Sequence, residues 1–272
     1  MINKFLSQKR AVFCFAFILL LLFAAIIGGA FTDGASARVS LTGRSRPPSR
    51  EHPLGTDPSG RDMLGQLVTE TRNSLLIAVG ITALTCAFGT AFGLIAGYFG
   101  GVVDMALMRV LDFVSMLPRL MLIIVFVTLI SEYGPVQLAL IMSALGWMYD
   151  ARIIRGKALS LRDEDFIRAA RSVGAPAAKI IARHFLPHLA PVIIVNFTLN
   201  LAGSIGVETG LSFLGFGLPF ATPRLGTLLN YAYVPENLQN RPWLWLPAVA
   251  LIFIVMMCIH YTGGALKRAI ND

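Results

Sequence analysis

The sequence predicts an all-α integral membrane protein with about six transmembrane helices, and three observations support this fold class. Of its 272 residues, 56% are hydrophobic and only 14% are charged, whereas about a quarter of the residues in soluble domains are charged. The apolar residues form long continuous runs, and about 20 apolar residues in a helix cross the hydrocarbon core of a bilayer. The alternating pattern of a β-barrel is missing, so helices are expected to satisfy the backbone polar groups in lipid.

Six apolar runs give the predicted spans in chain order. The first, second and last are free of charge, the third contains three charged side chains, and the fourth is short. The runs are Ala11–Ala30, Ser74–Phe99, Met105–Ile130, Tyr133–Tyr149, Leu189–Val207 and Trp243–Leu266.

The first run could be either a retained membrane anchor or a cleaved signal peptide. Basic residues precede it, and the stretch Ala35–Ala37 resembles a signal-peptidase site. However, the run is longer than the apolar region of a usual signal peptide, and further spans follow it. The sequence therefore favours a retained anchor.

The distribution of lysine and arginine predicts the orientation of the chain. The N-terminus, residues 150–188 and the C-terminus together carry thirteen of these residues, and the loops on the opposite side carry eight. Loops on the cytoplasmic side of a membrane are richer in lysine and arginine. We therefore expect both termini and residues 150–188 to lie in the cytoplasm.

A charged segment interrupts the apolar runs between the fourth and fifth predicted spans. The acidic residues 163–165 suit the positive end of a helix dipole. Phe166, Ala169, Ala170 and Val173 then follow at helical spacing and predict one apolar face. Gly174 and Pro176 predict a break before a second short helix, Ala177–Leu186, which is expected to end near Pro187.

This periodicity alone leaves two interpretations of residues 163–187 open. The segment could be an amphipathic helix whose arginines lie on anionic lipid. It could also be a docking element, because its small residues allow a partner to approach closely.

The segment resembles the EAA-type motif of binding-protein-dependent ABC importer permeases, through "AARSVGA" at Ala169–Ala175 and "HFLPH" at His184–His188. In that family the motif forms a coupling helix that inserts into a cleft on the ATP-binding subunit. The resemblance implies that Phe166, Arg168, Ala169, Ala170, Val173 and Gly174 contact the ATPase. Arg168 stands where family members usually have glutamate, so the salt bridge formed by that glutamate is not expected here.

Further blocks resemble the oligopeptide, dipeptide and nickel branch, and specifically its second, C-type permease subunit. They follow in order along the chain after residue 50. The blocks are "HPLGTDPSGRDMLGQLVTETRNSL" at His52–Leu75, "GYFGGVVDMALMRVLDFVSMLP" at Gly97–Pro118, "ETGLSFLGFGLP" at Glu208–Pro219 and "RPW…P" at Arg241–Pro247. Two departures from the family pattern are Leu225-Gly226, where members usually have Trp-Gly, and "YTGGALKRAIND" at Tyr261–Asp272, where an Asn-Leu-Leu-Gly-Asp pattern is commoner.

The resemblance implies a type I importer transmembrane architecture with a cytoplasmic coupling helix. Residues 1–50 would form the cytoplasmic tail, the first span and the start of the outer loop. Residues 51–272 would form the permease domain, with five core helices and a coupling loop at about 150–188. The expected location is the bacterial cytoplasmic (inner) membrane, with several passes through the bilayer.

The resemblance also implies the partners and the activity. A second homologous permease subunit would complete the pathway, forming a heterodimer, while two ABC ATP-binding subunits and an extracytoplasmic solute-binding protein would join it. The chain itself would bind no cofactor or nucleic acid, because ATP and magnesium belong to the partner subunits. Peptides are the expected substrate, and nickel or a metal–chelator complex is the alternative.

Three residues within or beside the predicted spans are candidates for the gate or the pathway. Pro118 removes a backbone donor and predicts a kink, and Arg119 follows it within an apolar run. Glu208 either faces the pathway, fixes the following glycine-rich turn, or is an interfacial carboxylate within reach of water.

The sequence contains no motif for catalysis or for binding nucleotide phosphates. GxxxxGK[ST], GxSxG, HExxH and CxxC are all missing, so neither an ATPase nor a membrane enzyme is predicted. A secondary transporter or channel is the more distant alternative. It would need an ionisable site at mid-membrane or inverted repeats with broken helices, and no such repeat is visible.

Overall fold

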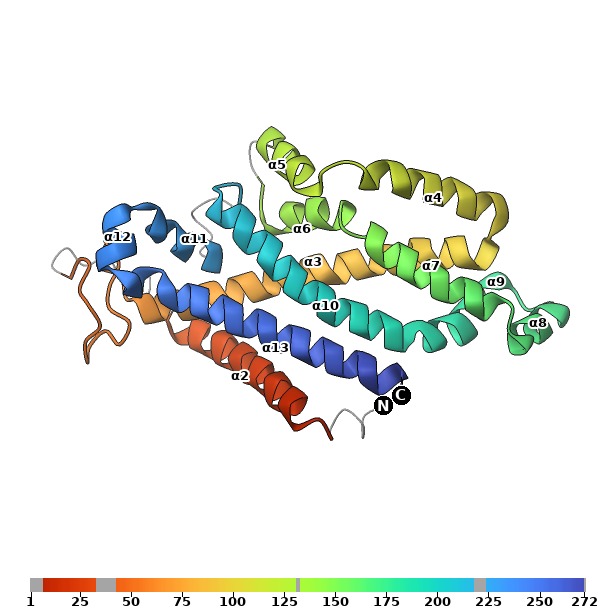
Figure 1. Cartoon of the computed structure of the whole chain (residues 1–272), viewed down its shortest axis with the longest axis horizontal. Coiled ribbons are helices and arrows are strands. Elements are labelled where there is room, and N and C mark those ends of the chain that lie inside the picture. The colour runs from red at the N-terminus through yellow and green to blue at the C-terminus, as the bar shows by residue number, and fades with distance from the viewer. Residues whose placement is uncertain (1–6, 33–42, 131–132, 218–223, 272) are drawn as a thin grey trace.

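The structure is a computed structural model that describes residues 7–32, 43–130, 133–217 and 224–271. Its long helices lie lengthwise in an elongated molecule, and the described residues contain no β-strand (Figure 1). Helix α8 (Asp165–Ser172) lies at one end, and helix α12 (Pro235–Asn240) lies at the other. We refer to these as the α8 end and the α12 end. The all-helical fold class is confirmed.

Long apolar helices form the body of the molecule. The stretches Met63–Phe99, Ala177–Phe213 and Leu246–Ile270 are each long and apolar enough to cross a membrane. They contain α3 (Met63–Phe99), α10 (Leu186–Phe213) and α13 (Leu246–Asn271). A bent helix pair adds a fourth candidate span, and α2 (Lys9–Thr32) covers the first predicted run. The stretch Ala35–Ala37 lies outside the described residues.

The third and fourth predicted spans are not continuous helices. The third divides into α4 (Gly101–Ser115) and α5 (Arg119–Leu129), whose axes are bent by 80°. Pro118 stands at the bend with an extended backbone, because its ring disfavours helix continuation. The fourth predicted span, Tyr133–Tyr149, contains α6 (Pro135–Ala144) and only the first two residues of α7 (Met148–Arg162). A tight turn separates the two helices, in which Gly146 N–H donates to the Ser143 carbonyl.

The segment predicted as a loop at 150–188 is largely helical. Helix α7 leads into α8, and α9 (Ala177–Ile180) follows after a turn. The predicted end of the second short helix near Pro187 is wrong. A π-helical turn, η1 (Ile181–Phe185), joins α9 to α10, so one helical path extends to Phe213. The wider turn accommodates a proline that has no N–H to donate.

Helices α3 and α7 pack closely because glycines recur on one side of α3. Gly89, Gly93 and Gly97 are spaced by four residues and therefore share one face of the helix. A Cβ atom at Gly93 would lie 2.6 Å from the Ala151 carbonyl oxygen, and one at Gly97 would lie 2.5 Å from the Ala158 Cβ. Small residues of this kind bring helix backbones together in membranes.

Replacement of Gly93 by valine is expected to destabilise the protein by more than about 1–3 kcal/mol, the usual cost of overpacking, because the clash involves backbone. Gly80→Val is the matched control, since a Cβ at Gly80 meets no atom within 4 Å. Thermal unfolding of the purified full chain in detergent measures the difference. Equal midpoints for the two variants would contradict this account of the α3–α7 contact.

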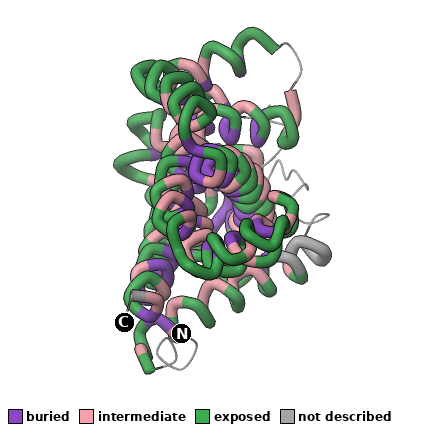
Figure 2. The backbone as a smooth tube through the Cα atoms, turned by 90° about the vertical axis from the view of Figure 1, so that its right-hand side faces the viewer, coloured by how far each residue is buried: buried purple, intermediate pink, exposed green. Residues whose placement is uncertain are grey.

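Buried residues lie along the inner sides of the packed helices, and exposed residues lie along their outer sides (Figure 2). The remaining short elements cap the α12 end. They are α11 (Leu225–Leu229), η2 (Asn230–Tyr233) and η3 (Pro242–Leu244). At the opposite side of the molecule, Arg268 near the C-terminus donates a hydrogen bond of 3.2 Å to Gln8.

Candidate functional site

Helix α8 is held against the body of the molecule by a single buried side chain. Ile167 is completely buried and packs in a cluster that includes Leu161, Ile180 and Phe185. Gly174 ends the turn after α8 with a φ of 75°, in the left-handed region that favours glycine. This turn reverses the chain, so that α8 lies at the tip of a short helical hairpin.

The outer side of this hairpin exposes apolar residues. Val173 is 84% exposed and Phe166 is 38% exposed, while Ala169 and Gly174 are also exposed. The predicted stripe needs one correction, because Ala170 is half-buried against the Ile167 cluster rather than on the open face. We define the α8 face as Phe166, Arg168, Ala169, Val173 and Gly174.

Sequence reasoning missed Ile167 as the anchor of α8. Ile167 and Ala170 are spaced by three residues, and this spacing could have revealed a second apolar face of the helix. Helix α8 thus has two apolar sides, one buried in the hairpin and one open. An eight-residue helix with two such sides is suited to lie between the body of this chain and another protein.

Aromatic and cationic contacts connect the hairpin to two long helices. The Phe166 ring stacks on the His188 ring of α10, with centroids 5.0 Å apart. The Arg171 guanidinium lies 4.8 Å from the centroid of the Tyr98 ring of α3, and Tyr98 in turn contacts the Phe185 ring. A displacement of α8 would therefore reach α3 and α10 through direct contacts.

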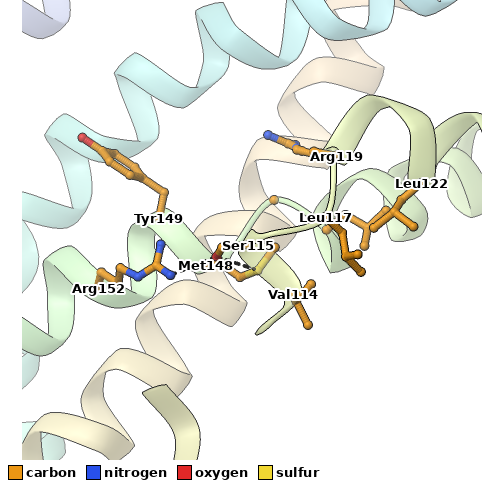
Figure 3. Close-up of a pocket in the computed structure, with 10 residues that line it drawn as sticks. Val114, Ser115, Leu117, Arg119, Leu122, Met148, Tyr149 and Arg152 are labelled. Carbon is orange, nitrogen blue, oxygen red and sulfur yellow. Dashed lines mark hydrogen bonds between the residues drawn. The ribbon is translucent and has the colours of Figure 1, made fainter. Parts of the chain in front are cut away.

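Pro118 and Arg119 lie at the bend between α4 and α5, beside a pocket of about 190 Å³. Arg119 donates a hydrogen bond of 3.2 Å to the Met142 carbonyl, and its guanidinium fills the space beside Gly146. Figure 3 shows Ser115, Met148 and Arg152 together in the lining of the same pocket. Two predicted gate residues thus lie at the bend, and their role in gating stays a prediction.

Helix α7 also binds α4 through two ion pairs. Arg152 lies 3.0 Å from Asp112, and Arg155 pairs with Asp104. These arginines are spaced by three residues and lie on the same side of α7. Because α7 leads directly into α8, the hairpin and the bent α4–α5 pair are attached to one helix.

Glu208 is completely buried near the α12 end and is paired with a buried arginine. Its Oε1 atom lies 3.3 Å from Arg224 Nη1 and accepts a hydrogen bond of 2.8 Å from Ser212. The interpretation of Glu208 as an interfacial carboxylate within reach of water is therefore wrong. Burial of an isolated charge is costly, whereas a paired and hydrogen-bonded one is tolerated.

The partner Arg224 was missed in the sequence. It is 1% exposed, and its Nη1 atom also donates to Ser212 at 2.7 Å. The Leu225 N–H that follows it donates to Ser74 on α3. The pair thus joins α3, α10 and the segment that leads into α11. One signal in the sequence could have revealed this pair: Glu208 is an isolated acidic residue in an apolar region, and Arg224 is an isolated basic residue near another such region.

The "GTDPSGRD" block forms the entrance to α3. The Asp57 carboxylate accepts hydrogen bonds from the N–H groups of Ser59 and Arg61, both at 2.8 Å, and from the Tyr231 hydroxyl at 3.0 Å. Burial, together with the Asp57 carboxylate, raises the pKa of Tyr231. Asp62 caps α3 by accepting from the Gly65 N–H at 2.8 Å. These hydrogen bonds therefore give Asp57 and Asp62 a structural role, which is to fix the loop before α3 and to cap the helix.

Comparison with known proteins places this architecture in one family. Residues 89–271 match the family model described as "Binding-protein-dependent transport system inner membrane component". The chain is 44% identical over 226 residues to the oligopeptide transport system permease protein OppC of Lactococcus lactis subsp. lactis (strain IL1403), covering 83% of this chain and 77% of that protein. It is 33% identical over 271 residues to OppC of Mycobacterium tuberculosis (strain H37Rv), covering 99% and 92%.

The fold also resembles that of a solved transporter. The match to an inward-facing MetNI methionine ABC transporter has a TM-score of 0.59 at 19% identity, and it covers 76% of this chain and 97% of that chain. This likeness confirms the type I importer fold. The chain belongs to the binding-protein-dependent inner membrane transport components, and within them to the OppC-type ABC importer permeases.

Proposed function

We propose that this chain is the transmembrane permease subunit of an ATP-driven importer of di- and oligopeptides. The observation that supports it most is the α8 face, an exposed apolar surface at the tip of a hairpin that is fixed to α3 and α10. Such a surface suits the docking of an ATPase. Family membership implies ATP-binding and solute-binding partners in general.

The finer assignments of partners and orientation rest on the same proposal. The chain pairs with a second homologous permease to form half of the pathway, and two ATP-binding subunits carry ATP and magnesium. The α8 end and both termini lie on the cytoplasmic side, where the ATPases bind. ATP-driven closure of the ATPases moves α8, and the differential contacts in the two states shift the bundle between outward and inward openings.

Peptides are favoured over nickel as the substrate. Relatives from Lactococcus lactis and Mycobacterium tuberculosis are named as oligopeptide permeases, and relatives from Brucella are named as putative peptide permeases. These names support peptide import, with selectivity supplied largely by the solute-binding protein.

Reconstitution of the complete transporter in proteoliposomes tests the proposed function. We expect ATP-dependent uptake of a radiolabelled tetrapeptide, and no uptake of nickel under the same conditions. A complex with a hydrolysis-deficient ATPase serves as the control and should show no uptake. Peptide uptake that follows an ion gradient in liposomes without the ATPase would contradict the proposal and support a secondary transporter.

A further inference from the structure

A pocket of about 410 Å³ lies between the start of α2 and the second half of α13, apart from the α8 face. Its wall is largely apolar, yet two cationic side chains belong to it. The lining residues are Lys9, Arg10, Phe13 and Cys14 from α2 and Tyr261 from α13. The pocket thus combines an apolar surface with positive charge, as a site for an amphiphilic anion would.

The charged side chains of the two helices that form this pocket are all positive. Helix α2 carries Lys9 and Arg10, helix α13 carries Lys267 and Arg268, and neither helix contains aspartate or glutamate. The hydrogen bond from Arg268 to Gln8 places the end of α13 beside the start of α2. None of the four cations forms an ion pair with a described residue. Their charge is therefore available to a bound anion.

The N-terminus of α2 adds a further positive potential. The first turn of a helix carries a partial positive charge, which acidic residues stabilise and basic residues do not. The first turn of α2 contains no acidic residue and begins with Lys9 and Arg10, both of which are exposed. An anion here would be stabilised by two side chains and by the helix N-terminus together.

The pocket lies where a membrane surface is expected. From its basic first turn, α2 continues through apolar residues to Thr32 and covers the first predicted span. Lysine and arginine near the end of such a helix extend to the headgroup region, and tyrosine is enriched at the same level. Phe13 is 72% exposed and Tyr261 is 40% exposed. In a bilayer these rings meet the upper part of the acyl chains.

We propose that this pocket binds an anionic phospholipid, with phosphatidylglycerol as the simplest example. The phosphate lies between Lys9 and Arg10, an acyl chain lies along Phe13 and Cys14, and the Tyr261 hydroxyl donates to an ester carbonyl. Basic pockets between transmembrane helices suit anionic headgroups. In the proposed orientation the lipid belongs to the cytoplasmic leaflet. This site goes beyond the proposed import function, which assigns no lipid to the chain.

Other occupants fit the pocket less well. A free phosphate would contact the cations but leave the rings of Phe13 and Tyr261 without a partner. A zwitterionic phospholipid would cover the rings, but its own ammonium group offsets the phosphate that Lys9 and Arg10 attract. A protein segment at this depth would carry backbone polar groups that lipid does not satisfy. An anionic phospholipid matches both the charge and the apolar wall.

Photolabelling of the complete transporter in phosphatidylcholine nanodiscs tests the proposal. The probes are phosphatidylglycerol and phosphatidylcholine, each with a diazirine on one acyl chain and added at the same small fraction. A basic residue beside an anionic headgroup is worth about fivefold in affinity. We therefore expect phosphatidylglycerol to label the peptides that contain Phe13 and Tyr261 roughly tenfold or more strongly than phosphatidylcholine does. Mass spectrometry locates the labels.

A double variant tests whether the two cations cause this preference. Lys9→Gln with Arg10→Gln is expected to bring labelling by the two probes close to equality. Lys157→Gln with Lys179→Gln removes the same charge from exposed positions of α7 and α9 and should leave the preference unchanged. Because all four side chains are exposed, neither change disturbs the packed core.

Three results would overturn the proposal. Equal labelling of the wild-type protein by the two probes would exclude a preference for anionic lipid, and this result needs no variant. A preference that survives Lys9→Gln with Arg10→Gln would place the anion elsewhere. Loss of labelling in excess glycerol 3-phosphate would indicate a site for soluble anions. None of these readouts requires transport, so a failure of ATP-driven peptide uptake would refute the proposed function without affecting the lipid site.

Discussion

Replacement of Glu208 by alanine is expected to lower the free energy of unfolding by about 3–5 kcal/mol, because it removes the carboxylate that forms an ion pair with the buried Arg224. Arg224 is 1% exposed and cannot recover the lost interaction from water. Ser212 would keep its bond to Arg224, but a hydroxyl does not neutralise a guanidinium. Chemical or thermal unfolding of the purified chain in detergent measures the loss.

Two further variants test whether the lost ion pair is the cause. Glu236→Gln removes an exposed carboxylate near the α12 end and is expected to change stability by less than about 0.5 kcal/mol. The double variant Glu208→Leu with Arg224→Leu removes both charges and should recover much of the loss. If the double variant is as unstable as Glu208→Ala, the ion pair is not the origin of the effect.

Substitution of Val173 by aspartate is expected to reduce peptide uptake and recovery of the ATPase with the complex by at least tenfold. Val173 is 84% exposed, so the change leaves the packing within this chain intact. In the proposed complex the same position lies against the ATPase, where burial of an unpaired carboxylate is costly. Co-purification from cells that express all subunits gives the first readout, and uptake in proteoliposomes gives the second.

The control variant for this experiment carries the same new carboxylate at a position outside the α8 face. Ser160→Asp puts the same carboxylate on an exposed position of α7 and should leave co-purification unchanged. Ala170 is a poorer choice, because it is half-buried against the Ile167 cluster and its replacement would also disturb the hairpin. Normal ATPase recovery with Val173→Asp would show that the α8 face is not the docking surface.

Much of the fold follows from properties of the sequence that act locally. Long apolar runs predicted the helices, and the acidic start, Gly174 and Pro176 predicted the division between α8 and α9. Gly174 predicted the turn because glycine readily adopts the left-handed backbone conformation that reverses the chain there. The "GTDPSGRD" block pointed to the family, and its Asp62 proved to be the cap of α3.

The features that could not be predicted depend on contacts between distant parts of the chain. Glu208 and Arg224 are both buried because they meet across the α12 end, and neither position alone specifies the partner. Pro118 predicts a kink but not its angle, because that angle depends on the packing of α4 and α5 on their neighbours. Pro187 predicts a helix end, whereas a π-helical turn before it lets the helix continue.

That uninterrupted path has a structural consequence. From Ala177 to Phe213 the helical path comprises 37 residues, which at about 1.5 Å per residue amounts to roughly 55 Å along the chain. Its two usual sources of kinks, the π-helical turn and Pro191, both lie in the half next to the hairpin. One unbroken helical path therefore joins the hairpin to the pair formed by Glu208 and Arg224.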